Sequence, residues 1–134
     1  MTFQPDNNPL SVISTEAFTA LERIGYPWPC VGTYNVLVKN YPNDFLTLIN
    51  SNKLNDEALS CCLQYGRYFS NSEVIKPQLT KFLDHPSSDV RIGAILGLIH
   101  HYNDSERESW LKSLLSNSSS HVRKEVTSIL NQEL

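Results

Sequence analysis

Apolar residues recur at helical spacing along most of the chain. Phe18, Leu21 and Ile24 follow one another three residues apart, and similar stripes return further along the sequence. Short polar segments separate these stripes, so the pattern predicts a succession of short helices. Segment 31–40 is predicted to be one of them, although its β-branched residues leave a β-strand as the competing prediction.

The C-terminal half of the chain contains an internal repeat. The stretch "SSDVRIGAILGLIHH" (87–101) returns as "SSSHVRKEVTSILNQ" (118–132), with Val90 aligned on Val122 at a shift of 32 residues. Each copy predicts a first helix, a polar turn and a second helix. The apolar positions of the first helix are Leu79, Phe82 and Leu83 or Leu111, Leu114 and Leu115, and those of the second are Val90, Ala94 and Leu98 or Val122, Val126 and Leu130.

The repeated unit resembles the HEAT repeat family. The motif "DHPSSDVRIGAILGL" has that family's polar turn ending in Asp-Val-Arg and a small residue within the second helix. The second copy departs from it, with His121 in place of the aspartate and Val126 in place of the small residue. The shift is also short for HEAT repeats, which span about 40–47 residues. The resemblance implies an all-α fold, an α-α superhelix of about three HEAT-like helix pairs.

One such helix pair cannot bury its own apolar face, so the pairs are expected to stack into one domain covering 1–134. Ile92, Leu96 and Ile99 are replaced by Lys124, Ser128 and Asn131 in the last unit, as expected for a polar capping repeat. The predicted parts are an N-terminal arm (1–13), a degenerate first pair (14–41), a degenerate repeat (43–70), a HEAT-like repeat (76–102) and a capping repeat (107–134).

Composition narrows the class of protein. The chain is 40% hydrophobic and 19% charged, which is typical of a folded globular protein, and its net charge is −3. No strong positive field is present to attract nucleic acid, and no apolar run is long enough for a membrane span. The start "MTFQPDNNPL" lacks the features of a signal peptide. With three cysteines and no CxxC motif, we expect a cytoplasmic protein with reduced thiols.

Four residues are candidates for structural roles. Arg91 and Arg123 recur at the same place in the two repeats, and the resemblance implies that this arginine pairs with an acid or carbonyl of a neighbouring repeat. Asp84 and Asp89 are the candidate partners.

The histidines are the only candidate metal ligands. His100 and His101 are adjacent at a helix end, and adjacent helical residues point about 100° apart, so the pair is poorly suited to share a metal with His85 or His121. Helix-end capping or exposure is the preferred interpretation.

The sequence contains no catalytic motif, neither a GxSxG nucleophile nor a glycine-rich phosphate loop. Gly93 and Gly97 lie inside a predicted helix, where they allow close helix packing. We therefore expect a protein that is not an enzyme and holds no cofactor or metal. Because some HEAT-like proteins are DNA glycosylases or bilin lyases, the fold alone does not exclude catalysis.

A binding surface is the remaining role. The second helices of such a stack line its concave side and present side chains that packing does not need. Size, charge and fold class resemble the immunity proteins of bacterial contact-dependent inhibition and polymorphic toxin systems. This resemblance implies a monomer that binds a cognate nuclease-type toxin one-to-one, with a scaffold or regulatory subunit as the alternatives. The candidate partner-binding residues are Trp28, Glu57, Gln64, Arg67, Tyr68, His100, Lys124 and Glu125.

Overall fold

The computed structural model describes residues 9–24 and 31–133, and within them every regular element is a helix. The protein is all-α, and segment 31–40 is a helix rather than a strand. The α-helices are α1 (Thr15–Ile24), α2 (Val31–Asn40), α3 (Pro42–Ile49), α4 (Asp56–Gln64), α5 (Ser72–Thr80), α6 (Ser88–Leu98), α7 (Asp104–Ser113) and α8 (Ser120–Glu133). Short 3-10 helices are η1 (Pro9–Val12), η2 (Tyr65–Tyr68), η3 (Lys81–Asp84), η4 (Ile99–His101) and η5 (Leu114–Ser116).

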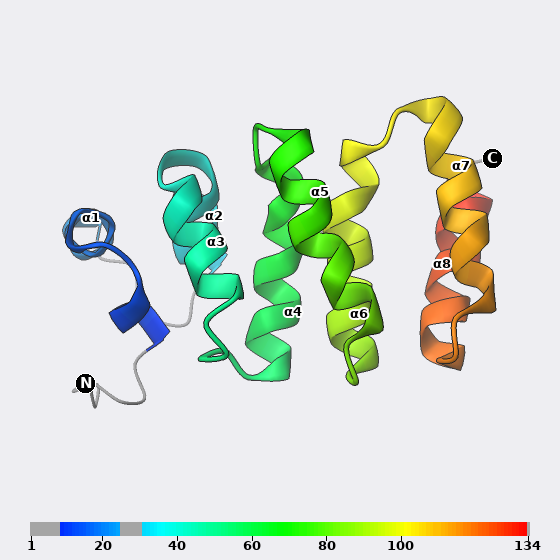
Figure 1. The fold of residues 1–134 in the computed structure, drawn as a ribbon, viewed down its shortest axis with the longest axis horizontal. Helices are drawn as coiled ribbons and strands as arrows, with labels where there is room; N and C mark the ends of the chain where they lie inside the picture. Colours follow the sequence, from blue (N-terminus) through cyan, green and yellow to red (C-terminus); the bar gives the residue numbers. More distant parts are fainter. Residues whose placement is uncertain (1–8, 25–30, 134) are drawn as a thin grey trace.

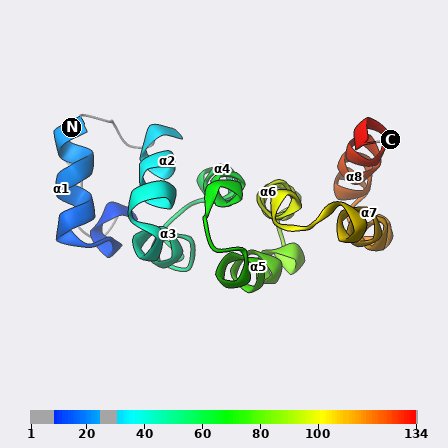
Figure 2. The same cartoon turned by 90° about the horizontal axis from the view of Figure 1, so that it is seen from above.

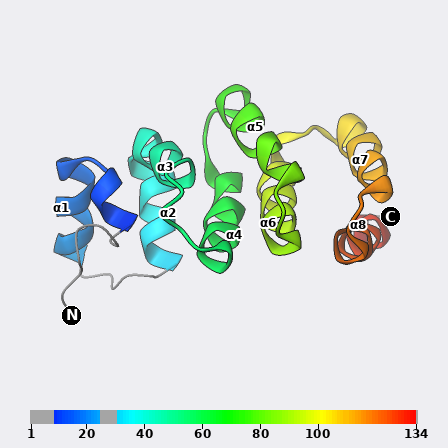
Figure 3. The same cartoon turned by 60° about the horizontal axis from the view of Figure 1, so that its bottom comes forward.

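The helices form a row that follows the sequence from α1 at one end to α8 at the other (Figure 1). Seen from above, α3, α5 and α7 make one layer of this row (Figure 2), and Figure 3 shows α2, α4, α6 and α8 as the other. We call the second group the even-helix layer. Within it α4 contacts α6 and α6 contacts α8, while α5 packs on α6 and α7 on α8. Each helix pair thus contacts mainly its neighbours.

The 32-residue period is visible in the helix caps. The side-chain oxygens of Asn55, Ser87 and Ser119 each accept the backbone N–H three residues later, at 2.8, 3.4 and 3.3 Å. These capping bonds satisfy one of the free N–H groups at the start of α4, α6 and α8. The period therefore includes α4, where the sequence pattern alone is degenerate.

The cores of neighbouring pairs are continuous. One buried cluster runs from Ile13 to Leu98, and a second joins α6 to α8; Leu83 and Trp110 pack against both. Nearly all the predicted repeat positions are buried or half-buried, but Leu115 is 39% exposed. Leu115 and its equivalent Leu83 both lie in 3-10 segments, but Leu83 packs against both clusters, whereas Leu115 packs against neither.

The stacking positions follow the predicted contrast between the last two units. Ile92, Leu96 and Ile99 pack into the cluster between α6 and α8. The equivalent residues of α8 are polar, and Lys124 and Ser128 are exposed. The face of α8 turned away from α6 is therefore hydrated.

Gly93 and Gly97 are where α4 and α6 approach most closely. A Cβ on Gly93 would lie 2.5 Å from the backbone oxygen of Ser60, and one on Gly97 would overlap the backbone oxygen of Leu63. Both of these oxygens belong to the main chain, which, unlike a side chain, cannot rotate away from the new atom. The predicted packing role of the two glycines is confirmed, and it fixes the distance between two helices of the even-helix layer.

Arg91 links two consecutive turns. Its Nε donates to the carbonyl of His85 at 2.5 Å, and its Nη1 donates to Asn117 Oδ1 at 2.9 Å and Ser118 Oγ at 3.0 Å. Within the described part of the chain, the repeat-equivalent Arg123 donates only to the carbonyl of Asn117, the residue equivalent to His85. Among the described residues, the acceptors of Arg91 are thus carbonyl and neutral side-chain oxygens. The predicted partners Asp84 and Asp89 accept no hydrogen bond from Arg91 or Arg123.

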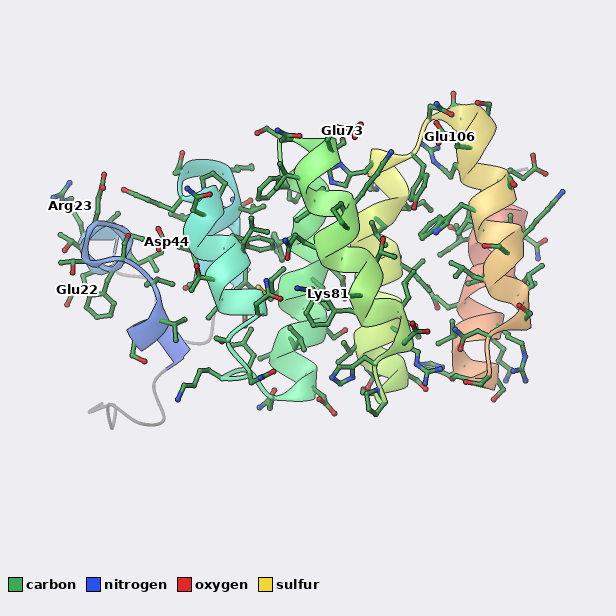
Figure 4. All side chains as sticks on the ribbon, viewed as in Figure 1. Glu22, Arg23, Asp44, Glu73, Lys81 and Glu106 are labelled. Carbon is green, nitrogen blue, oxygen red and sulfur yellow. The ribbon has the colours of Figure 1, made fainter. Side chains whose placement is uncertain are left out.

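The first helices of the last two pairs begin earlier than residues 76 and 107. Asn71 and Asn103 cap α5 and α7 through their side-chain oxygens, at 3.2 and 2.9 Å from the N–H groups that they accept. Asn103 also donates its amide to Glu106, which lies at the start of α7 (Figure 4). These local bonds start each helix ahead of Leu79 and Leu111, the first apolar positions that the two repeats share.

The N-terminal segment is packed where it is described. Residues 9–12 of the predicted arm form η1, and Ile13 is buried in the first core cluster. Ser14 caps α1 and is itself held by Asp44 of α3, whose carboxylate accepts from the Ser14 N–H at 2.6 Å and its hydroxyl at 3.0 Å. Figure 4 labels Asp44, which projects from α3.

His101 is buried, in contrast to the predicted exposed or capping position. Its Nε2 lies 2.9 Å from the carbonyl oxygen of Gly66, which can only accept, so this nitrogen carries the proton. Its Nδ1 then accepts from the Ser72 hydroxyl at 2.7 Å. The side chain ties η4, which directly continues α6, to η2 and to the start of α5.

Candidate protein-binding face

An open groove of about 360 Å³ crosses the even-helix layer. Residues of three helices line it, and Figure 2 shows α4 and α6 side by side in that layer. We call it the acidic groove. Its lining residues are Glu57, Ser60, Cys61, Gln64, Asp89, Ile92, His121 and Glu125.

The charges in the acidic groove follow the repeat. Glu57, Asp89 and His121 are each the second residue of their helix and occupy equivalent positions 32 residues apart. His121 Nε2 lies 3.5 Å from Asp89 Oδ1, and Glu125 adds a third carboxylate one turn along α8. Three carboxylates from α4, α6 and α8, neighbours in the even-helix layer, therefore face one depression.

The local structure accounts for this gathering of acids. Glu57 and Asp89 lie in the first turns of α4 and α6, where free N–H groups favour negative charge. The Asp89 side chain is 72% exposed and that of His121 is 61% exposed, so water hydrates both side chains. The acids can therefore lie close together at small cost to stability while giving the groove a negative potential.

Cys61 also lines the acidic groove. Burial, followed by the nearby charge of Glu57, raises the pKa of its thiol above the usual value. Cys62, on the buried side of α4, has a pKa raised further, again mainly by burial. A thiol beside a histidine and an aspartate has the residue types of a cysteine hydrolase, but such a nucleophile needs a lowered pKa. The electrostatics of this groove suit binding better than nucleophilic attack.

The raised pKa of Cys61 predicts its reactivity. In a Cys30→Ser background, the reaction of Cys61 with the disulfide reagent DTNB should need a higher pH than that of free cysteine, because less thiolate is present at a given pH. Glu57→Gln should move the pH–rate curve back to lower pH, since it removes one cause of the shift. Glu125→Gln, which changes another acid of the groove, is the control and should move it less.

A second, smaller pocket of about 100 Å³ adjoins the acidic groove at the far end of α4. Gln64 lines both, and Tyr65, Arg67 and Tyr68 complete the smaller one. Arg67 donates to the Tyr68 hydroxyl at 2.6 Å, and its guanidinium carbon lies 4.7 Å from the ring centroid. The even-helix layer is therefore acidic at one end of α4 and cationic and aromatic at the other.

The structure groups most of the predicted partner-binding residues. Glu57, Gln64 and Glu125 line the acidic groove, and Gln64 continues into the pocket of Arg67 and Tyr68. His100 in η4 and Lys124 on α8 are exposed and line neither depression. Trp28 lies outside the described residues.

The sequence interpretation does not assign several residues of this face to partner binding. It gives Asp89 a structural role and treats His121 as a motif departure and a poorly suited metal ligand, yet both align with Glu57 when the 32-residue register is extended to α4. Lys39 of α2, which lies over the Tyr68 ring, has no such signal because the first helix pair does not share the repeat. Asp84 is exposed in η3, outside this face.

Among the residues that the structure describes, no group of three histidine, cysteine, aspartate or glutamate side chains could hold a metal ion. None of the helices in this part of the chain is both long and apolar enough to cross a lipid bilayer. No protein-family model, curated protein or solved structure matches the chain. The inference about function therefore depends on the geometry of the face itself.

Proposed function

We propose that the chain is a non-catalytic binding module that covers a cationic surface of another protein with the acidic groove. The observation that carries this proposal is the convergence of Glu57, Asp89 and Glu125, from three helices of the even-helix layer, on one open depression. Lysine and arginine side chains of a partner are the natural counterpart of three hydrated carboxylates. Opposite charges would also speed the encounter of the two proteins at low salt.

The scaffold under the acidic groove supports a protein partner. The groove is wide and open and lies on helices whose spacing is fixed by Gly93, Gly97 and the side chain of Arg91. A surface that is already shaped loses little conformational freedom on binding, which favours high affinity. A small ligand is usually enclosed by a more apolar cavity.

Within this class we propose a stoichiometric immunity protein that occludes a nuclease-type bacterial toxin in the cytoplasm. A nuclease must bind polyanionic substrate, so the surface around its active site is cationic. An acidic, preshaped helical face is complementary to such a surface. The 32-residue helix pairs, with their recurring caps and arginines, support the HEAT-like repeat architecture on which this comparison is based.

Capture of the partner tests the proposal. The tagged chain should retain one dominant cationic protein at about one-to-one, and the complex should weaken as salt rises. The variant Glu57→Gln/Asp89→Asn/Glu125→Gln should bind it about tenfold more weakly, since exposed charges contribute about 0.2–1 kcal/mol each.

The matched control removes three exposed charges elsewhere, as Glu22→Gln/Glu73→Gln/Asp84→Asn. Glu22 on α1 and Glu73 on α5 are labelled in Figure 4 and lie outside the acidic groove. Equal binding by the groove variant and the wild-type chain would contradict the proposal. Many weakly held proteins would favour a scaffold instead.

A further inference from the structure

Two cations from different helices converge on one exposed tyrosine. The ammonium of Lys39, in the last turn of α2, lies 5.0 Å from the Tyr68 ring centroid, and the guanidinium of Arg67 lies 4.7 Å from it. Tyr68 is 41% exposed. We call Lys39, Arg67 and Tyr68 the cationic clamp.

The positive charge of the cationic clamp is not compensated by an acid. Within the described residues, the hydrogen bonds and cation–π contacts of Lys39 and Arg67 are with Tyr68 alone, and neither cation forms an ion pair. The two distances to one centroid place the cations within about 10 Å of each other. An anion bound beside Arg67 would therefore experience the positive potential of both side chains, most strongly at low salt.

The tyrosine of the cationic clamp is held by aromatic packing, and the clamp has free hydrogen-bond donors. Tyr68 packs on Tyr65 with ring centroids 5.9 Å apart, and Tyr65 packs on the buried Tyr34 at 6.2 Å. Because the Tyr68 hydroxyl already accepts from Arg67, its own hydrogen is directed elsewhere. The Tyr68 hydroxyl and the free guanidinium N–H groups of Arg67 can donate to one carboxylate, and the pocket of about 100 Å³ that both residues line has room for such a group. Lys39 does not line this pocket, but its ammonium adds positive potential beside the ring.

We propose that the cationic clamp binds an aspartate or glutamate side chain of the same protein partner whose cations enter the acidic groove. Gln64 lines both depressions, so one partner segment can reach both. Glu57 in α4 and Arg67 in η2, which directly continues α4, are separated by about 15 Å along the helical axis. The partner segment therefore carries basic and acidic residues about that far apart, which fixes its direction on the face. This inference rests on the proposed function.

Titration of the ¹⁵N-labelled chain with charged peptides tests the inference at low salt. Hexaglutamate should shift the backbone amide signals of Lys39 and of residues 64–68. Hexalysine should instead shift those near Glu57, Asp89 and Glu125. The variant Lys39→Gln/Arg67→Gln should weaken hexaglutamate binding by about fivefold. The control Arg23→Gln/Lys81→Gln removes two exposed cations labelled in Figure 4 on α1 and η3, and should leave it unchanged.

The possible outcomes separate the two proposals. Absence of hexaglutamate shifts at the clamp, or equal weakening by the control variant, would overturn the clamp while leaving the groove intact. Tighter binding of inorganic phosphate than of hexaglutamate would overturn the assignment to a protein carboxylate. If hexalysine alone caused no shifts near Glu57, Asp89 and Glu125, the proposed role of the acidic groove would be contradicted instead. Both altered cations of the clamp are exposed, and circular dichroism would check that the variants fold.

Discussion

Replacing Gly97 by alanine is expected to lower the free energy of unfolding by about 3 kcal/mol, at the upper end of the usual cost of overpacking. In an exposed helix the same change would stabilise the protein by about 1 kcal/mol, because alanine is the better helix former. Here the new methyl group would overlap the backbone oxygen of Leu63, and Leu79 Cδ1 would be 3.1 Å away. α4 and α6 would have to separate, which would also widen the layer that carries the acidic groove.

Urea denaturation followed by circular dichroism measures this effect, and Gly66→Ala is the control. A Cβ on Gly66 would meet Leu79 Cδ1 at 2.8 Å, but this atom is the end of a flexible side chain that can turn away. We therefore expect the control to cost about 1 kcal/mol or less. Equal stability of Gly97→Ala and the wild-type chain would show that the helices are not in close contact.

Arg91→Lys is expected to cost about 2 kcal/mol although it preserves the charge. A lysine ammonium cannot reproduce the planar fork that reaches the His85 carbonyl and, across to the next turn, Asn117 and Ser118. Each such bond from a charged donor contributes about 1.5–3 kcal/mol when well formed, and lysine retains part of this. The melting temperature should fall by roughly 6 °C.

Arg123→Lys is the matched control for this prediction. Arg123 makes only the bond to the carbonyl within its own repeat, so its replacement should cost about half as much. Thermal unfolding of the two variants, measured in parallel, decides the point. A loss of stability as large for Arg123→Lys as for Arg91→Lys would contradict the role of Arg91 in joining consecutive turns.

The sequence predicts the architecture best where buried side chains repeat. Val90 and Val122 mark the register, and the close packing of Gly93 and Gly97 follows from glycine inside an apolar helix. The starts of α5 and α7 were placed too late because they depend on Asn71 and Asn103, whose capping bonds involve single polar residues. The burial of His101 also depends on acceptor and donor groups of two other elements, Gly66 and Ser72, which spacing does not reveal.

The candidate site could be predicted only in part. Glu57, Gln64 and Glu125 were identified because each lies on the solvent side of a second helix. That they meet in one groove depends on how far each helix pair is rotated against the next, which the sequence does not state. The sequence predicts only part of the cationic clamp. Arg67 and Tyr68 are neighbours in sequence, whereas Lys39 reaches them only through the packing of α2 against η2.

Hydrogen–deuterium exchange on the chain, free and bound to its captured partner, tests the central claim most directly. Exchange should slow in peptides that cover α4 and the first turns of α6 and α8, because these lie under the acidic groove. Peptides from α5 and α7, in the other layer, should change little. Slowing confined to α5 and α7 would contradict the assignment of the even-helix layer as the binding face.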